Sequence, residues 1–454
     1  MAGLLAAAAG PADAAKLRFG PGPHGDPRDV AASPVDVTNA TFGQREARLV
    51  LRLRTRSAWN AADLDPAAGR ALCVELFTAS GSTPRARMCV VNRDGKAALQ
   101  YMDLNPAGQV DSQRPLPAAV RRPSRSSLDA GFTRVEAGLP RGRFRWRVVS
   151  TWTDAASCPI TTPCVDKAPD KGTYVDRINY VAGPRCFGAA SRSRCSNPAL
   201  RRAIVPTPRA ATRGPNAFCA SGSRVGLVGV CTFGTSEELS STSVAILGDS
   251  HAQHWRGALE VVAQAKHWHG LSITRSGCPL TQATPILASG PTASQQCRQW
   301  NGEVQAWFRR HPEVSTVVMA AHAGARTTGG TKAGYRAAWH ALPSSIRHIV
   351  VIRDTPSIGI VNGCIRRALA KHKLAGPACA VKRSRGIHPD EHYAAARSSG
   401  DSRVRTIDMT RFFCSRLCLP IIGGALVYKD GTHMTRIYAG TLGQFLLARI
   451  NRVT

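Results

Sequence analysis

The clearest architectural signal in the sequence is residues 244–255, Val-Ala-Ile-Leu-Gly-Asp-Ser-His-Ala-Gln-His-Trp. Four consecutive apolar residues after a Ser/Thr-rich segment predict a fully buried strand, and Trp255, Leu259 and Val262 then recur at helical spacing. Ser250 is therefore expected where a strand passes into a helix. The free N–H groups and positive dipole at that helix end suit a nucleophile, because they stabilise an oxyanion. The alternative is structural, since serine is a common N-cap.

A second polar stretch, Tyr428–Thr435, precedes the last helical pattern. A serine nucleophile needs a base to take its proton and an acid to orient that base. Asp430 and His433 lie three residues apart in this stretch, where the catalytic loops of an open α/β sheet gather, and they supply both groups. The alternative interpretation is a surface turn that caps the helix beginning at Thr435.

Together the two stretches resemble the SGNH (GDSL-like) hydrolase family, in which a Gly-Asp-Ser block carries the serine and a C-terminal Asp-x-x-His block completes the triad. The similarity is closer still to the extracellular SGNH domain that follows the membrane acyltransferase-3 domain in bacterial O-acetyltransferases of cell-surface glycans. The residues that carry the resemblance are Leu247–Ala252 with His254 and Trp255, Cys278 and Pro279, Asp408 with Cys414 and Cys418, Tyr428–Thr435, and upstream Cys195–Leu200 and Cys231–Gly234.

The resemblance implies that Ser250 is the nucleophile, that His433 is the base and that Asp430 orients it. It also implies an oxyanion hole made by the Ser250 N–H, a glycine in the next block and an asparagine. Gly277 is the best candidate for the glycine. No asparagine follows the predicted strand that ends at Ala320, where the loop reads Ala-His-Ala-Gly. Since one donor contributes about 2.7 to 4 kcal/mol to transition-state stabilisation, either His322 or a backbone N–H substitutes, or the reaction is slow.

Two histidines near these blocks are candidate substrate contacts, His251 beside the nucleophile and His322 in the loop that lacks asparagine. Each has a structural alternative. His251, like His254, would pack against or cap the first helical turn, and His322 would be an ordinary loop residue.

The chain contains fourteen cysteines, an even number that falls into seven pairs of sequence neighbours. None has the C-x-x-C spacing of a zinc ribbon and histidines do not cluster beside them, so disulfides are the better interpretation and no metal site is expected. Sequence does not fix connectivity, and neighbour pairing is the simplest arrangement. Because disulfides persist only in an oxidising compartment, we expect a secreted or envelope-associated, extracytoplasmic protein. The neighbours are Cys73 and Cys89, Cys158 and Cys164, Cys186 and Cys195, Cys219 and Cys231, Cys278 and Cys297, Cys364 and Cys379, and Cys414 and Cys418.

The C-terminal half alternates strand and helix patterns, which predicts a mostly parallel sheet with helices on both faces. The loops after the parallel strands then meet at one edge, where Ser250, Gly277, His322 and Asp354 are expected. The predicted elements are strands at 271–274, 315–320, 346–353 and 404–407, and helices at 295–310 and 332–341.

The N-terminal part alternates apolar and basic residues with period two, as in Arg45–Thr55 and Arg143–Val149, which predicts an antiparallel β-sandwich. It would act as a spacer, or bind glycan if Trp59, Trp146 and Trp152 stack on sugars rather than fill the core. The expected domains are a truncated signal peptide or Ala-rich tail at 1–15, the β-sandwich at 16–166, a disulfide-held connector at 167–237 and an SGNH hydrolase-like domain at 238–454.

The net charge of +31 comes mostly from arginines scattered over every segment, while aromatic residues are only 6% of the chain. A nucleic-acid binder gathers its charge on one stripe with aromatics between, so we expect no nucleic-acid partner. The charge is either a solvated surface or an attraction to anionic wall polymers and lipid headgroups.

These patterns predict an exported serine-dependent O-acyl (acetyl) esterase or O-acyltransferase acting on cell-surface or wall glycans. Its partners would be extracellular polysaccharide or peptidoglycan. No window of eighteen apolar residues occurs, so a transferase would need a separate membrane acyltransferase or another acyl donor. No cofactor is expected. The competing function is a catalytically silent glycan- or wall-binding protein with an SGNH fold.

Overall fold

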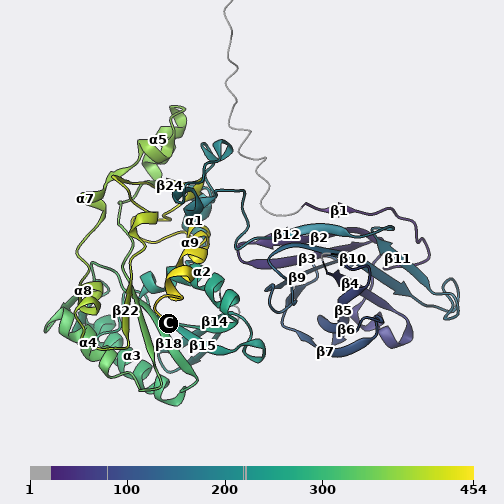
Figure 1. Cartoon of the computed structure of the whole chain (residues 1–454), viewed down its shortest axis with the longest axis horizontal. Helices are drawn as coiled ribbons and strands as arrows, with labels where there is room; N and C mark the ends of the chain where they lie inside the picture. Colours follow the sequence, from purple (N-terminus) through teal and green to yellow (C-terminus); the bar gives the residue numbers. More distant parts are fainter. Residues whose placement is uncertain (1–21, 79, 218, 220–221) are drawn as a thin grey trace, which may run out of the picture. The chain divides into compact units, whose positions relative to one another are not determined.

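The computed structural model describes residues 22–78, 80–217, 219 and 222–454, and the predicted leader at 1–15 lies outside them. The chain folds as two compact units, one within Arg18–Gly183 and one within Pro184–Thr454 (Figure 1). Residues 167–237, predicted as a connector, contribute one strand to the first unit and two strands to the second.

The first unit is an antiparallel β-sandwich of two sheets, with strand orders β1-β2-β3-β9-β8 and β11-β10-β4-β5-β6-β7, and β12 pairs with β10. Phe42 and Leu51 from one sheet and Val74 and Trp146 from the other belong to one buried core, because alternate residues of each strand point inward. The bounds are β1 His24–Gly25, β2 Val37–Arg45, β3 Arg48–Thr55, β4 Ala71–Phe77, β5 Pro84–Arg93, β6 Lys96–Leu104, β7 Val110–Leu116, β8 Ala119–Arg121, β9 Ser127–Phe132, β10 Gly142–Trp152, β11 Cys164–Ala168 and β12 Tyr174–Ile178.

The three tryptophans offered as sugar-stacking platforms do not form one. Trp146 is 0% exposed and Trp59 is 3% exposed, and both belong to the core of the sandwich. Trp152 is only half-buried, and the Arg70 guanidinium lies 5.9 Å from its ring centroid. The suggestion of a glycan-stacking surface is therefore wrong for Trp59 and Trp146, whose rings are needed to fill the core.

The second unit contains a mixed sheet of order β13-β14-β16-β15-β18-β20-β22, in which β16, β15, β18, β20 and β22 are parallel. Ala245 and Leu247 of β15 share a core with helices α3, α4 and α8, while α2 packs on the sheet and on α9. The predicted α/β class with a preceding β-sandwich is confirmed. The bounds are β13 Gly222–Val225, β14 Val228–Gly234, β15 Thr242–Gly248, α2 Ser250–Lys266, β16 Trp268–Thr274, α3 Pro291–Arg310, β18 Val314–Ala320, α4 Thr331–His340, β20 His348–Ile352, α8 Glu391–Arg397, β22 Val404–Ile407 and α9 Arg436–Ile450.

This unit also contains shorter helices and strands in the segments that connect the main elements. They are α1 Pro208–Arg213, β17 Thr284–Ile286, β19 Arg326–Thr328, α5 Asn362–Ala370, α6 Ala375–Ala378, β21 Val381–Lys382, α7 Arg383–Gly386, β23 Leu417–Cys418, β24 Ile421–Ile422 and β25 Ala425–Leu426. Within the described residues no helix is both long and apolar enough to cross a membrane.

All fourteen cysteines are paired, and each pairs with its sequence neighbour as predicted. The loops that the disulfides close are short, and on the chain-entropy model such loops contribute about 2 to 3 kcal/mol each to the free energy of unfolding. Seven disulfides fit the oxidising environment outside the cytoplasm.

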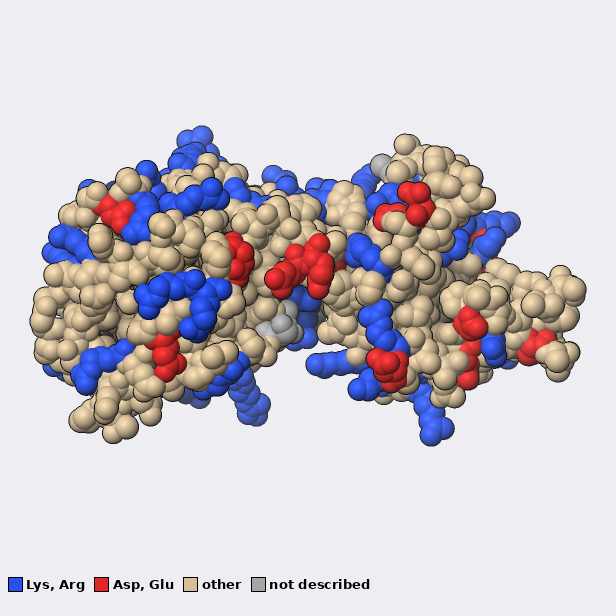
Figure 2. Space-filling view, turned by 90° about the horizontal axis from the view of Figure 1, so that it is seen from below, with Lys and Arg blue, Asp and Glu red and all other residues tan. Residues whose placement is uncertain are grey.

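Lysine and arginine side chains are dispersed over the face of the molecule drawn in Figure 2, among larger areas of uncharged residues. No continuous basic stripe crosses the described residues on that face. This distribution matches the scattered arginines of the sequence rather than the concentrated charge of a nucleic-acid binder.

Candidate active site

Ser250 is the first residue of α2 and follows directly on β15, as the apolar run and helical pattern predict. Asp249 is the N-cap, and its Oδ1 accepts a hydrogen bond from the His251 N–H at 2.8 Å. Ser250 therefore lies at the positive end of the helix dipole.

Gly248 explains how the chain turns this sharply at the end of β15. Its φ is +140°, and a Cβ placed on it would lie 2.2 Å from the Ala320 carbonyl oxygen of the neighbouring strand β18. Any other residue would push the two central strands apart. The glycine thus brings Ser250, the predicted nucleophile, close to the loop that follows β18.

The three predicted catalytic side chains form one chain of hydrogen bonds. The Ser250 Oγ lies 2.8 Å from His433 Nε2, and His433 Nδ1 lies 2.9 Å from Asp430 Oδ2. Because an ionised carboxylate accepts the Nδ1–H proton, Nε2 is left to accept the serine proton. The site brings together Ser250 and His433, which are 183 positions apart in sequence, with the geometry that serine activation needs.

Asp430 is held in its ionised form. Burial alone would raise its pKa, but hydrogen bonds from the His433 ring and from the backbone N–H groups of His433 and Thr432 place the pKa far below the usual range. The carboxylate is therefore charged at any physiological pH and can stabilise an imidazolium that forms on His433.

Hydrogen bonds from α2 and from the loop after β20 hold the loop that carries Asp430 and His433. His254 Nδ1, on α2 and fully buried, accepts the Met434 N–H at 3.3 Å. From the loop after β20, Thr355 Oγ1 donates to the Thr432 carbonyl and Ser357 Oγ donates to the Gly431 carbonyl, both at 3.2 Å. These contacts fix the imidazole relative to the nucleophile.

Two carboxylates whose positioning role the sequence did not predict join the loops of neighbouring strands. Asp249 Oδ2 accepts the His322 N–H at 2.8 Å, so the N-cap of α2 also holds the loop after β18. Asp354, after β20, accepts the Ala323 N–H at 2.7 Å. Both aspartates are more than nine-tenths buried. The only sequence signal for Asp354 is its place at the end of a buried strand.

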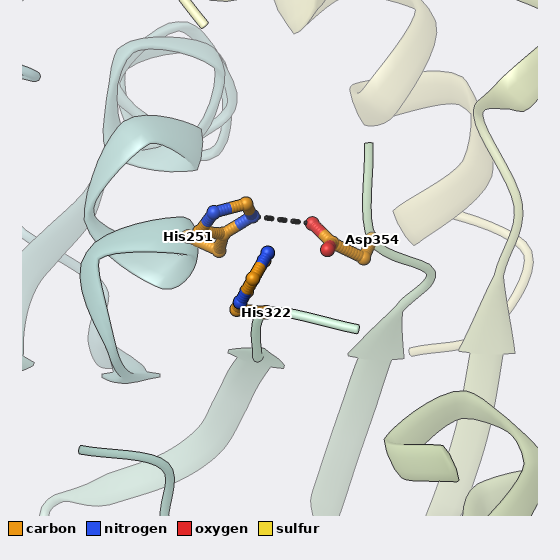
Figure 3. A group of neighbouring side chains, drawn as sticks. All are labelled: His251, His322 and Asp354. Carbon is orange, nitrogen blue, oxygen red and sulfur yellow. Dashed lines mark hydrogen bonds and ion pairs between the residues drawn. The ribbon is translucent and has the colours of Figure 1, made fainter. Parts of the chain in front are cut away.

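His251, His322 and Asp354 point toward one another from the first turn of α2 and from the ends of β18 and β20 (Figure 3). His251 Nδ1 lies 2.6 Å from Asp354 Oδ1. Burial acts to lower the pKa of His251, but Asp354 more than offsets it, and the pKa lies above its ordinary value. Burial and the neighbouring His251 lower the pKa of His322. One donor atom from each of the three lies within 4.8 Å of the others, so this group could also hold a metal ion.

A cavity of about 480 Å³ opens beside the triad. Its lining includes both candidate contact histidines, His251 and His322, together with Thr432 from the loop of the base. Arg353 and His388 add further polar groups. The lining is partly apolar, and its histidine and threonine side chains can hydrogen-bond a hydroxyl-bearing ligand.

Gly277 lies in the loop after β16, which is the parallel neighbour of β15, and thus at the same sheet edge as Ser250. The Arg275 N–H donates to the Gly248 carbonyl at 3.1 Å and ties the two loops together. Gly277 has a φ of +69° and is exposed. The backbone N–H groups of His322 and Ala323 are already bonded to carboxylates, so neither is placed to replace the absent asparagine.

A family model described as "SGNH domain (fused to AT3 domains)" matches residues 216–448, a segment that includes the whole triad. Among solved structures, the chain is similar to the Salmonella ser. Paratyphi A lipopolysaccharide acetyltransferase periplasmic domain, at 14% sequence identity and a TM-score of 0.39. That similarity covers 47% of this chain and 85% of the other. No curated protein sequence matches.

Proposed function

The chain belongs to the family of SGNH domains fused to AT3 domains, and from this we propose that it transfers acetyl groups between hydroxyl groups of extracytoplasmic glycans through an acyl-enzyme on Ser250. The observation that carries the proposal is the continuous hydrogen-bond chain from Ser250 through His433 to Asp430. A purely structural serine at a helix N-terminus would not need a base that is itself oriented by a carboxylate.

In the first half-reaction the Ser250 Oγ attacks the carbonyl carbon of the donor ester while His433 Nε2 takes the serine proton. The tetrahedral intermediate collapses with cleavage of the bond to the leaving alkoxide. The imidazolium, stabilised by Asp430, returns its proton to that alkoxide. The product is an acetyl ester on Ser250 and a free hydroxyl on the donor.

In the second half-reaction His433 takes the proton of an acceptor hydroxyl, and the acceptor oxygen attacks the acetyl-serine. Collapse releases the new ester, and the proton returns to the Ser250 Oγ. A glycan hydroxyl as acceptor gives transfer, and water gives hydrolysis. The cavity beside the triad, with its histidine and threonine lining, offers hydrogen bonds to a sugar acceptor.

The oxyanion would be held by the Ser250 N–H, the Gly277 N–H and the imidazole of His322. His322 lines the cavity, and its lowered pKa favours the neutral ring, which still donates one hydrogen bond. This assignment replaces the family's asparagine with a side chain from the same loop.

The environment follows from the disulfides and the basic surface. Seven disulfides favour an extracytoplasmic protein, and a net charge of +31 attracts it to anionic envelope polymers. The acetyl donor would be an ester loaded by a membrane acyltransferase.

The test is hydrolysis of a short-chain aryl acetate by the full chain, by Ser250→Ala and by Ser289→Ala. Ser289 is exposed in the loop before α3 and serves as the matched control. We expect the wild type and Ser289→Ala to hydrolyse the ester equally and Ser250→Ala to fall by at least about 10³-fold. Equal background rates for all three proteins would favour the silent glycan-binding function instead.

A further inference from the structure

Four aspartates gather at one end of the β-sandwich, outside the active site. They are Asp26 after β1, Asp29 in the following loop, Asp166 on β11 and Asp170 in the loop between β11 and β12. One oxygen from each lies within 4.8 Å of the others. Such a concentration is unexpected in a chain with 29 acidic and 60 basic residues.

Two buried oxygen atoms in this cluster, one on Asp166 and one on Asp26, receive no hydrogen bond from a described residue. Asp166 is 2% exposed, and its Oδ2 accepts the Val37 N–H at 2.6 Å, but no described residue donates to its Oδ1. The Asp26 Oδ2 is buried and unpartnered in the same sense. A buried carboxylate oxygen without a donor is costly, so a group outside the protein is expected to satisfy it.

Two further buried polar groups, Asp36 and Tyr174, lie beside the four aspartates. Asp36, which precedes β2, is 0% exposed and lies close enough to Asp166 to repel its charge. The Arg56 guanidinium lies 3.9 Å from the Asp36 carboxylate. The Tyr174 hydroxyl is also buried without a described partner, and its pKa is raised to about 12 by burial and by Asp26 and Asp166.

The mutual repulsion of these carboxylates contributes to their raised pKa values. Burial and the charges of neighbouring aspartates raise the pKa of Asp26 to about 7, and burial with Asp36 and Asp29 raises that of Asp166 to about 6. The close approach of the four carboxylates is therefore unfavourable unless a cation or a proton lies between them.

We propose that Asp26, Asp29, Asp166 and Asp170 bind one Ca²⁺ ion. An all-carboxylate donor set selects a hard cation over zinc, which prefers nitrogen and sulfur. Calcium–oxygen distances of about 2.3 to 2.6 Å allow oxygens on opposite sides of the ion to lie about 5 Å apart, which matches the observed spread.

The ion would join the two sheets of the sandwich. Asp26 follows β1, the edge strand of one sheet, and β11, which carries Asp166, is an edge strand of the other. β1 pairs with β2 over only two residues, so the segment has little other backbone support. Calcium would stabilise the sandwich and fix its N-terminal segment.

The test is thermal unfolding of the chelator-treated full chain during titration with CaCl2 up to about 5 mM, above the dissociation constants of extracellular calcium modules. We expect saturating calcium to raise the Tm of the sandwich by about 5 to 10 °C. Calorimetric titration should give one ion per chain. Magnesium at the same concentration should give a much smaller shift.

Three variants make the result specific. Asp166→Asn keeps an acceptor for the Val37 N–H, and Asp170→Asn changes an exposed side chain. We expect both to unfold without the calcium-dependent rise. The exposed Asp94→Asn, in the turn between β5 and β6, should keep the full rise. No shift in the wild type, or an equal shift in Asp170→Asn and Asp94→Asn, would overturn the proposal.

Discussion

Three carboxylates hold the parts of the candidate active site together, and of these Asp249 and Asp354 are buried while Asp430 is partly exposed. Asp430 orients the imidazole, Asp249 joins the nucleophile to the loop after β18, and Asp354 joins that loop to His251. Each carboxylate makes charge-assisted hydrogen bonds to a neighbouring loop or ring, and such bonds are stronger than neutral ones. The position of Ser250, the proposed nucleophile, therefore depends on the residues that hold the loops around it.

His254 is the positioning residue whose role is easiest to isolate. We expect His254→Phe to lower kcat for aryl acetate hydrolysis by about 10- to 100-fold with little change in KM, because the buried Met434 N–H loses its acceptor and releases the loop of His433. His254→Asn keeps an acceptor and should retain more activity. Equal losses in the two variants, or a change confined to KM, would refute a positioning role.

The raised pKa of Asp26 predicts how the sandwich responds to pH. A folded pKa of about 7, above the usual aspartate value of 3.8, means that the folded state holds the proton more tightly than the unfolded state does. The contribution of protonated Asp26 to the free energy of unfolding is therefore fully present below about pH 4 and is lost as the pH rises through 7.

The neutral Asp26→Asn variant lacks this titration. In calcium-free buffer, its Tm minus that of the wild type should increase between pH 4 and pH 7.5, as followed by calorimetry. Saturating calcium should reverse the sign of the difference at pH 7.5. A difference that stays constant with pH would contradict the account of this residue.

At the scale of elements, the close approach of β15 and β18 sets the position of α2 and of Ser250. In Gly248→Ala the new Cβ would meet the Ala320 carbonyl oxygen at 2.2 Å, in a backbone conformation that favours glycine. We expect a loss of at least about 2 kcal/mol in the free energy of unfolding, and the loss of esterase activity.

The matched control is Gly302→Ala on α3, where a Cβ meets no atom within 4 Å. There we expect a gain of about 0.5 to 1 kcal/mol from helix propensity, with activity unchanged. Urea unfolding of both variants measures the two effects. A Gly248→Ala protein as stable and active as the wild type would show that the two strands can separate without cost.

The elements that sequence predicted well are those with strong burial patterns. The strands at 315–320 and 404–407 and the helix at 295–310 are confirmed as β18, β22 and α3 because their apolar residues fill one core. The triad residues also follow from local motifs. β13 has an exposed, glycine-containing sequence, and nothing in its periodicity marks it as a strand of the sheet.

Contacts between distant segments could not be predicted from local patterns. Asp249 and the His322 N–H are 73 residues apart, and Asp26 and Asp166 are farther still, so only the folded sheets bring them together. Trp59 and Trp146 show the opposite error, because a tryptophan in a strand has the same sequence pattern whether it faces a ligand or the core.

At the scale of the whole molecule, disulfides that close short loops stabilise both the β-sandwich and the α/β unit. Cys278–Cys297 closes 19 residues and Cys414–Cys418 closes 4, and all four cysteines are buried in the second unit. Replacing the first pair by alanines should cost about 3 kcal/mol of unfolding free energy, and replacing the second pair about 2 kcal/mol. Urea unfolding of the two double variants gives the order, and the reverse order would argue against the loop-entropy explanation.

The second unit is proposed to be a self-sufficient catalytic domain. Its compact part begins at Pro184 and contains all three triad residues. Residues 184–454, exported to an oxidising compartment, should fold and hydrolyse aryl acetates with the kcat of the full chain, and the first unit should contribute only anchoring or calcium binding. A truncated protein that folds, as judged by circular dichroism, yet is inactive would disprove this independence.

The central claim is that Ser250 carries the acyl group, and the most direct measurement is the mass of the protein stopped by acid shortly after mixing with an aryl acetate. The account predicts a mass increase of one acetyl group, located by peptide mapping on the segment that contains Ser250 and absent from Ser250→Ala. Acetylation found elsewhere, or found equally in Ser250→Ala, would contradict it.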